Sequence, residues 1–279
     1  MRRLKHNFKK GMAFVLSLAM VAGLVPAMSG GANTVQAATG SGTEPSVTAY
    51  ATKAQLMTAF TPDANGTATT KGKLVFGKKS DGTTAQEWYI LGADSGVSGD
   101  NTIIFAASPI ATVQKFDSSS TNKTDSNLWS ECNYGGASVT EVFANHYGAS
   151  ELRAVLKGMT DGSNTSCFTT AEQGLMNDTT VTTTDKKNRK TYTTTDKLYA
   201  LAADGAGDSY KIIKAGSDNR TVLAIRNYCN SGEGFWMRSP NDSFSYASLY
   251  AWPGHKVNYN DVYTYAAVQP ASNLKLSSV

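Results

Sequence analysis

Side chains suited to nucleophilic or acid–base chemistry are scarce in this 279-residue chain. Beyond its N-terminal leader it has His146 and His255, and its three cysteines are Cys132, Cys167 and Cys229. Cys229 and His255 could form a nucleophile–base pair, but nothing in the sequence around either indicates activation, which favours a buried thiol and a surface histidine. A G-x-S-x-G elbow, an H-E-x-x-H helix and a Walker loop are absent from the sequence. We therefore predict that the protein is not an enzyme and name no catalytic residue.

The carboxylates and thiols do not form a recognisable metal site in the sequence. Asp204 and Asp208 lie in a Gly-rich loop and could hold calcium, but the EF-hand spacing is absent, so calcium is the less favoured alternative to no cofactor. The cysteines have no C-x-x-C spacing, which argues against zinc. One disulfide with one leftover thiol, or three free thiols, both fit an exported protein.

Residues suited to binding are concentrated near the C-terminus, at 241–267. This segment is crowded with Tyr, Asn, Ser and Asp, a composition that suits exposed loops and short strands better than a buried amphipathic element. Tyr and Trp give large contact area with little rotamer entropy, and Ser and Asn give adaptable hydrogen bonds, as in antibody paratopes. The predicted ligand-binding residues are Asp242, Phe244, Tyr246, Ser248, Tyr250, Trp252, His255, Tyr259, Asp261, Tyr263 and Tyr265.

Strand signals dominate the chain ahead of this segment. Apolar and β-branched runs predict strands at 73–76, 87–91 and 102–107, with a Gly/Ser/Asp loop at 94–101. Thr-rich arms at 181–184 and 191–194 flank a basic cluster at 186–190, which predicts a β-hairpin with a solvated tip.

Two segments have helical patterns. At 150–159, Leu152, Val155, Leu156 and Met159 fall on one face, and Ser150 is placed to cap the N-terminus. A shorter helix is expected at 170–176, with Thr170 and Gln173 at the spacing of a capping box.

The N-terminus predicts export. The first eleven residues carry five Lys or Arg and no acid, and an apolar stretch at 12–25 follows that is too short for a comfortable membrane span. Residues 35–37, Val-Gln-Ala, fit a small-x-small cleavage site, and cleavage after Ala27 is an alternative. We expect a signal peptide at 1–37, a linker at 38–55 and one ligand-binding domain at 56–279, secreted from or displayed on a Gram-positive bacterium.

Charge gives no indication of a nucleic-acid partner. The chain has 26 Lys and Arg against 22 Asp and Glu, and removal of the five leader bases leaves 21 against 22. The mature protein is therefore near neutral, so the basic pI reflects the leader. We expect an extracellular protein or glycan as partner, with no membrane insertion after signal cleavage.

Six short segments, read in order, resemble the motifs of one bacterial family. They lie at 87–91, 167–176, 194–201, 235–240, 257–262 and 267–271, and include Thr-Thr-Asp-Lys at 194–197, Trp-Met-Arg-Ser-Pro at 236–240 and Val-Gln-Pro-Ala at 268–271. The chain thus resembles a widespread family of exported bacterial proteins of unknown function, whose pattern runs T-T-D-K, W-L-R-S-P and V-R-P-A. The match extends over about residues 70 to 276.

The resemblance implies an α+β, C-type-lectin-like fold similar to formylglycine-generating-type domains, with antiparallel strands, two short helices and long loops. It implies that 236–240 and 268–271 lie on core strands, near each other, and that the ligand face lies between them in sequence. Some members resemble variable proteins of diversity-generating retroelements, whose C-terminal codons are mutated at adenines. Diversification of 241–267 is therefore an alternative to a fixed polar loop.

Two departures from the family pattern limit what it implies. Gln269 replaces the closing Arg, so any salt bridge of that Arg is lost, and the preceding Gly is Ala267. The cysteines of formylglycine-generating enzymes have no convincing counterparts, which argues against that chemistry.

Two other functions stay open. One is an exported enzyme or glycan-modifying module with an unrecognised site, and the other is a structural surface-layer component that binds copies of itself. A deep pocket with a convergent acid–base pair would favour the enzyme, whereas a shallow aromatic face would favour binding.

The leader gives a first prediction. N-terminal sequencing of protein secreted by the native host should begin at or near Ala38, because residues 12–25 act as the core of a cleaved signal peptide. Recovery of membrane-bound protein that retains this apolar stretch would contradict it.

Overall fold

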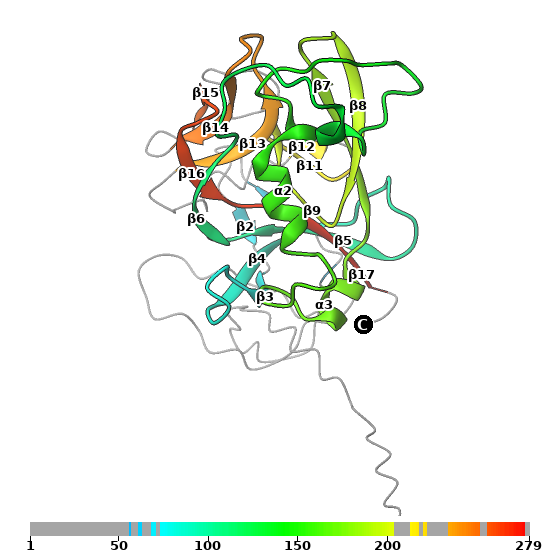
Figure 1. Ribbon diagram of the computed structural model, residues 1–279. Helices are drawn as coiled ribbons and strands as arrows, with labels where there is room; N and C mark the ends of the chain where they lie inside the picture. The colour runs from blue at the N-terminus through cyan, green and yellow to red at the C-terminus, as the bar shows by residue number, and fades with distance from the viewer. Residues whose placement is uncertain are drawn as a thin grey trace, which may run out of the picture.

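The computed structural model describes Leu56 and residues 61–62, 68–70, 73–203, 213–217, 220–221, 234–251 and 256–276. The predicted signal peptide and linker lie outside these ranges, as do Asp204, Asp208, Cys229, Trp252 and His255. Within the described ranges, no helix is both long and apolar enough to cross a membrane. The chain forms mostly antiparallel sheets with two α-helices in its described part, so the α+β class is confirmed (Figure 1).

One five-stranded sheet has the order β3-β4-β5-β17-β9. Its neighbouring strands are all antiparallel, and the last strand of the chain, β17, lies between β5 and β9. The predicted strands at 73–76, 87–91 and 102–107 all belong to it, each within a residue or two of its observed ends. The strands are β3 (Lys73–Lys78), β4 (Ala85–Gly92), β5 (Asn101–Ala106), β9 (Leu198–Tyr199) and β17 (Ala271–Lys275).

A second five-stranded sheet has the order β15-β14-β13-β16-β6. Its strands are β6 (Ala111–Lys115), β13 (Phe235–Pro240), β14 (Tyr246–Ala251), β15 (Lys256–Asp261) and β16 (Tyr265–Val268). β13 pairs in parallel with β16, where Phe235 lies opposite Ala267. The prediction that these two segments lie near each other is therefore confirmed. Together they hold both ends of the Tyr- and Asn-rich segment.

Both sheets contribute to two hydrophobic clusters, because each strand presents alternate residues to opposite faces. The larger cluster includes Leu74 and Trp88 from the first sheet and Trp236 and Val268 from the second. The other joins Tyr89 and Phe105 to Phe235 and Met237. The rings of Phe105 and Phe235 lie 5.7 Å apart, which is direct contact between the sheets. Neither cluster belongs to one sheet alone.

The helices cover part of this assembly, with α2 in front of the sheets in Figure 1. α2 (Glu151–Gly158) begins at Ser150, whose Oγ accepts a hydrogen bond from the Arg153 N–H, so the predicted cap is confirmed. α3 (Thr170–Leu175) is also where a helix was expected.

The predicted capping box of α3 is wrong by one residue. Thr169, not Thr170, precedes the helix, and its hydroxyl accepts from the Glu172 N–H at 3.2 Å. The Glu172 carboxylate returns a bond by accepting from the Thr169 N–H at 2.7 Å. Glu172 forms the better box because its carboxylate is a charged acceptor, which strengthens the returning bond.

The Thr-rich arms form the predicted hairpin, β7 (Thr179–Asp185) and β8 (Lys190–Asp196). Its inward residues include Val181 and Tyr192, both buried. The described chain also contains the short strands β1 (Thr61–Pro62), β2 (Ala68–Thr70), β10 (Ala202–Ala203), β11 (Ile213–Ala215) and β12 (Arg220–Thr221), and the single-turn helices η1 (Ser126–Trp129) and η2 (Tyr147–Ala149).

Polar residues of the family-like motifs lie inside the fold. Asp196 is buried and accepts two bonds from Nε of Arg153, at 3.0 and 3.1 Å. Arg238 is buried, with Nη1 donating to the Ala200 carbonyl at 2.7 Å. Gln269 is buried and donates to the Ala106 carbonyl at 3.2 Å. These polar side chains contribute hydrogen bonds to the interior of the fold.

Burial of Trp236 gives a test of the core. Its indole is 1% exposed, packs edge-on against Phe116 at 5.7 Å and donates to the Gln114 carbonyl at 2.9 Å. Trp236→Ala should lower the free energy of unfolding by about 3–5 kcal/mol, measured by chemical denaturation. Leu128→Ala, at a 47% exposed position, is the control and should cost less than about 0.5 kcal/mol. Equal costs for the two variants would contradict this packing.

Candidate ligand-binding face

The register of β14 against β15 sets the arrangement of the predicted binding residues. Tyr246 pairs with Asp261, Ser248 with Tyr259 and Tyr250 with Val257. Directly opposed residues share a face of a sheet, and so do alternate residues along a strand. The register therefore places positions 246, 248, 250, 257, 259 and 261 on one face of this hairpin, and Val257 is buried in the core. For 248 and 250 this placement rests on the backbone alone.

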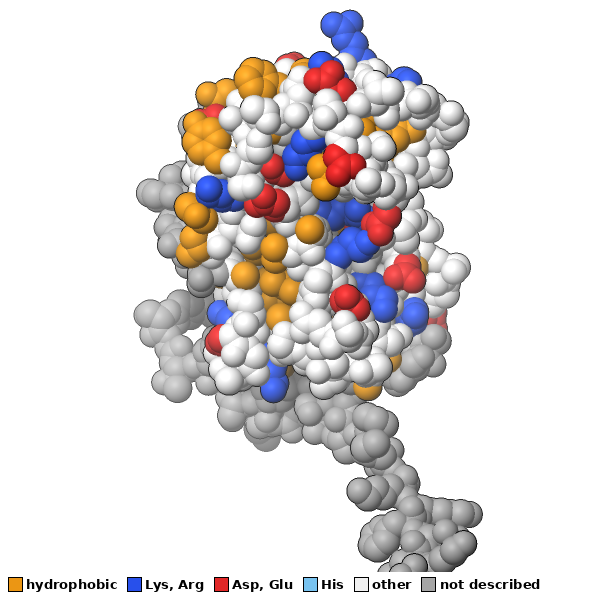
Figure 2. Space-filling view, in the orientation of Figure 1, with side chains coloured by type: hydrophobic (Ala, Val, Ile, Leu, Met, Phe, Trp, Pro, Cys, Tyr) orange, Lys and Arg blue, Asp and Glu red, His pale blue; other side chains and the backbone are white. Residues whose placement is uncertain are grey.

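Six of the predicted residues come together here, and we call them the aromatic face: Asp242, Phe244, Tyr246, Tyr259, Asp261 and Tyr263. Phe244, Tyr246 and Tyr263 are 49%, 37% and 46% exposed, unusually high for large hydrophobic side chains. The Tyr263 hydroxyl donates to Asp261 Oδ2 at 3.1 Å, and this bond raises the pKa of Tyr263. In Figure 2, orange side chains gather at the upper left, where Figure 1 places β14, β15 and β16.

The tip of the β7–β8 hairpin borders the aromatic face. Lys186 Nζ lies 2.8 Å from Asp242 Oδ1. Partial burial raises the pKa of Tyr259, while the charge of Lys186 lowers it and the charge of Asp242 raises it. Lys186 and Lys187 are about one-third exposed. The tip is therefore partly solvated at these two lysines, and Arg189 and Lys190 are exposed.

A third segment, 141–146, connects the hairpin tip to the aromatic face. Lys187 Nζ lies 3.0 Å from the Glu141 carboxylate and 5.4 Å from the centroid of the Phe143 ring. Phe143 in turn lies 6.3 Å from the Phe244 ring, centroid to centroid. Sequence reasoning missed Glu141, Phe143 and the two lysines as members of this region. The basic cluster was the available signal, but composition does not reveal which surface a hairpin tip contacts.

Of the other predicted binding residues, Ser248 and Tyr250 lie on the β14–β15 hairpin and are placed by its backbone pairing, whereas Tyr265 is not joined to the aromatic face by any described contact. Tyr265 begins β16 and is 62% exposed, with Lys115 Nζ 5.1 Å from its ring centroid. In the sheet order, β13 separates β16 from β14, so Tyr265 is not a neighbour of Tyr246 along the ladder. Trp252 and His255 lie outside the described residues.

His146 has the chemistry of an acid–base group but is enclosed. Its Nδ1 accepts from the Ala149 N–H at 3.1 Å, which leaves the proton on Nε2, 2.7 Å from the Tyr134 hydroxyl. Tyr134 donates onward to Asp185 Oδ2 at 2.7 Å. The imidazole also stacks on Tyr192, with ring centroids 4.2 Å apart. A side chain only 2% exposed cannot reach a substrate, so this network serves the fold.

The described part of the chain contains neither an activated thiol nor a metal site. Cys132 and Cys167 are free thiols, and burial raises the pKa of Cys132 to about 12, so it stays protonated at neutral pH. The described residues contain no group of three or more His, Cys, Asp or Glu side chains placed to hold a metal ion.

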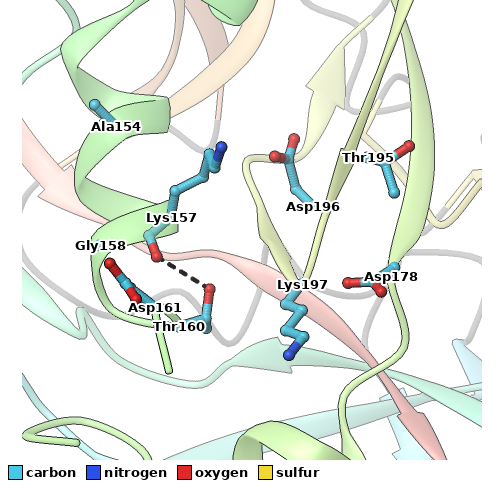
Figure 3. Close-up of a pocket in the computed structure, with 9 residues that line it drawn as sticks. All are labelled: Ala154, Lys157, Gly158, Thr160, Asp161, Asp178, Thr195, Asp196 and Lys197. Atoms are coloured by element: carbon cyan, nitrogen blue, oxygen red, sulfur yellow. Dashed lines mark hydrogen bonds between the residues drawn. The ribbon is translucent and has the colours of Figure 1, made fainter. Parts of the chain in front are cut away.

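A groove of about 600 Å³ lies between the end of α2 and strand β8 (Figure 3). Two of its charged side chains are engaged within the fold, since Asp196 binds Arg153 and Lys157 binds Glu131. Its lining residues are Ala154, Lys157, Gly158, Thr160, Asp161, Asp178, Thr195, Asp196 and Lys197. No aromatic side chain lines the groove, in contrast to the aromatic face.

No protein-family model, curated protein or solved structure matches this chain.

The enclosed histidine predicts a pH dependence of stability. Burial lowers the pKa of His146 to about 4, although Asp185 favours its protonation, and Lys123 and Arg153 oppose it. The unfolded chain therefore binds a proton between about pH 6.5 and 4 that the folded chain does not. The free energy of unfolding should fall by roughly 3 kcal/mol as the pH drops through this range.

Urea unfolding at a series of pH values measures this loss. His146→Gln is the control, because its amide does not titrate, and its stability should depend less on pH in the same range. An unchanged slope in His146→Gln would assign the titration to other groups.

Proposed function

We propose that this protein is an exported, surface-displayed or secreted binding protein whose aromatic face binds an extracellular protein or glycan. The observation that carries the proposal is the exposure of Phe244, Tyr246 and Tyr263. Tyr246 pairs with Asp261, which the Tyr263 hydroxyl contacts, and Phe244 lies two residues before Tyr246. Contiguous exposed rings are uncommon on soluble proteins and mark interaction sites.

The chemistry around these rings suits recognition. The Asp242 side chain is 89% exposed, so its carboxylate retains accepting capacity beyond its bond to Lys186. Asp261 accepts from the Tyr263 hydroxyl, which orients that ring at the surface. Rings that give contact area and polar groups that give orientation are the two components of antibody paratopes.

We further propose that the α+β arrangement is C-type-lectin-like and that the segment between β13 and β16 is open to sequence diversification. Two mostly antiparallel sheets, two short helices and long connections support the first part. The pairing of β13 with β16 supports the second, because it anchors both ends of the segment in the core. A reverse transcriptase and a near-copy of the 3′ coding segment in the neighbouring DNA would support diversification.

Truncation of the exposed rings tests the binding role. A ligand is first identified by glycan array or by pull-down from neighbouring cells. Alanine variants at Tyr246, Tyr259 and Tyr263 should then each weaken binding by about 2 kcal/mol where the ring lies at the centre of the interface, measured by calorimetry. Tyr246→Ala and Tyr263→Ala should lower the melting temperature much less than Trp236→Ala does, because these rings are 37% and 46% exposed whereas Trp236 is 1% exposed.

Val113→Ala is the matched control. Val113 is 60% exposed on β6, at the opposite edge of the same sheet from β15, and its truncation should change neither binding nor stability. Collapse of stability in the tyrosine variants with unchanged binding per folded molecule would make these rings part of the core and end the proposal. Self-association that the tyrosine variants abolish would instead support a surface-layer component, and turnover of a bound glycan would support an enzyme.

A further inference from the structure

The turn between β13 and β14 carries Asp242 and Phe244 of the aromatic face, and one distant side chain holds its backbone. Asn145 Nδ2 donates to the carbonyl oxygens of Asn241, Ser243 and Tyr246, at 2.9, 2.7 and 2.8 Å. The Asn145 backbone N–H also donates to the carbonyl of Phe244, at 3.3 Å. Four carbonyls of this turn therefore depend on a residue about one hundred positions earlier in the chain.

The chemistry of these contacts requires an amide. Three carbonyl oxygens surround the terminal nitrogen, which fixes the orientation of the Asn145 side chain, since an oxygen there would face three other acceptors. Two N–H hydrogens serve three acceptors, so at least one is shared. Asn145 is 1% exposed, so water cannot replace these bonds if they are lost.

The outward side chains of the turn contribute little to its shape. The described contacts of Asp242 and Phe244 are with Lys186 and Phe143, across the surface and away from the turn's own backbone. Within the turn, the Asn241 N–H donates to the Tyr246 carbonyl at 2.9 Å, and the Asn241 side chain accepts from the Ser243 N–H through Oδ1 at 2.7 Å.

We infer that Asn145 is the positioning residue of the aromatic face and that Asp242 and Phe244 are positions at which specificity can change without loss of the turn. The statement about specificity rests on the proposed binding function. The statement that Asn145 holds the turn can be tested without any ligand, so it can fail while the proposed function stands, and the reverse.

The chain contains a matched control for this arrangement. Asn101, 3% exposed, donates through Nδ2 to the carbonyls of Asp94, Val97 and Gly99, at 3.1, 3.0 and 3.0 Å. Replacement of either asparagine by aspartate preserves size and removes the same three bonds. Only the Asn145 contacts reach the aromatic face.

The first measurement is amide hydrogen exchange of the mature wild-type protein. The amide hydrogens of Asn241 and Tyr246 should exchange on the order of tenfold or more slowly than those of the exposed turn at 134–137. This measurement needs no variant. Exchange as fast as in that exposed turn would overturn the inference.

The second measurement compares variants, with each rate taken relative to core strand β4 so that global destabilisation cancels. Asn145→Asp should speed exchange at 241–246 on the order of tenfold, whereas Asn101→Asp should speed it at 94–101 and leave 241–246 within about twofold. Asp242→Ala and Phe244→Ala should also leave 241–246 within about twofold. If Asn145→Asp does not fold, Asn145→Ala removes the donor without adding a charge.

Two results would overturn the inference at this stage. One is an Asn145 variant that folds with no local increase in exchange at 241–246. The other is loosening of the turn by Asp242→Ala or Phe244→Ala to the same extent as by Asn145→Asp, which would mean that the outward side chains hold the turn themselves.

Discussion

Buried side-chain amides that donate to loop carbonyls are the interaction on which this structure depends. Much of the chain runs outside strands and helices, and every buried carbonyl there needs a donor. Asn101 supplies it for the loop at 94–99, and Asn145 for the turn at 241–246. Gln173 donates in the same way to the carbonyls of Asn164 and Phe168, at 2.7 and 3.0 Å. An amide suits this role because it provides two donors without bringing a charge into the interior.

The core constrains where these loops begin and end. β13 and β16 are adjacent and parallel, and Trp236 and Phe235 point to opposite faces, one into each hydrophobic cluster. The 24 residues between Pro240 and Tyr265 therefore leave and re-enter the core at fixed points. In the described part of this segment, Asn145 and the β14–β15 ladder hold the backbone.

The sequence predicted the elements whose signals are local. The 3.6-residue periodicity and Ser150 located α2, and the alternating Thr-rich arms located the β7–β8 hairpin. The capping box of α3 was predicted one residue too late, because Thr169 and Thr170 can both cap a helix. The choice depends on the side chain three residues later, and the Glu172 carboxylate accepts from the Thr169 N–H. Contacts between segments far apart in sequence were not predictable from one chain. No sequence pattern predicts the contacts of Phe143 with Lys187 and Phe244. The same is true of the hydrogen bonds from Asn145 to the β13–β14 turn.

Segment 141–146 links the aromatic face to the interior, because two consecutive residues of this segment form hydrogen bonds in different parts of the protein. Asn145 binds the β13–β14 turn, while the next residue, His146, is held by Ala149, Tyr134 and the ring of Tyr192. A side chain can orient three carbonyls only if its own backbone is fixed, and the neutral, stacked imidazole provides that fixation. The position of Asn145 thus depends on a histidine that stays unprotonated at neutral pH because it is buried. The position of Phe244 on the β13–β14 turn therefore depends on the packing of Asn145 and His146, both of which are buried.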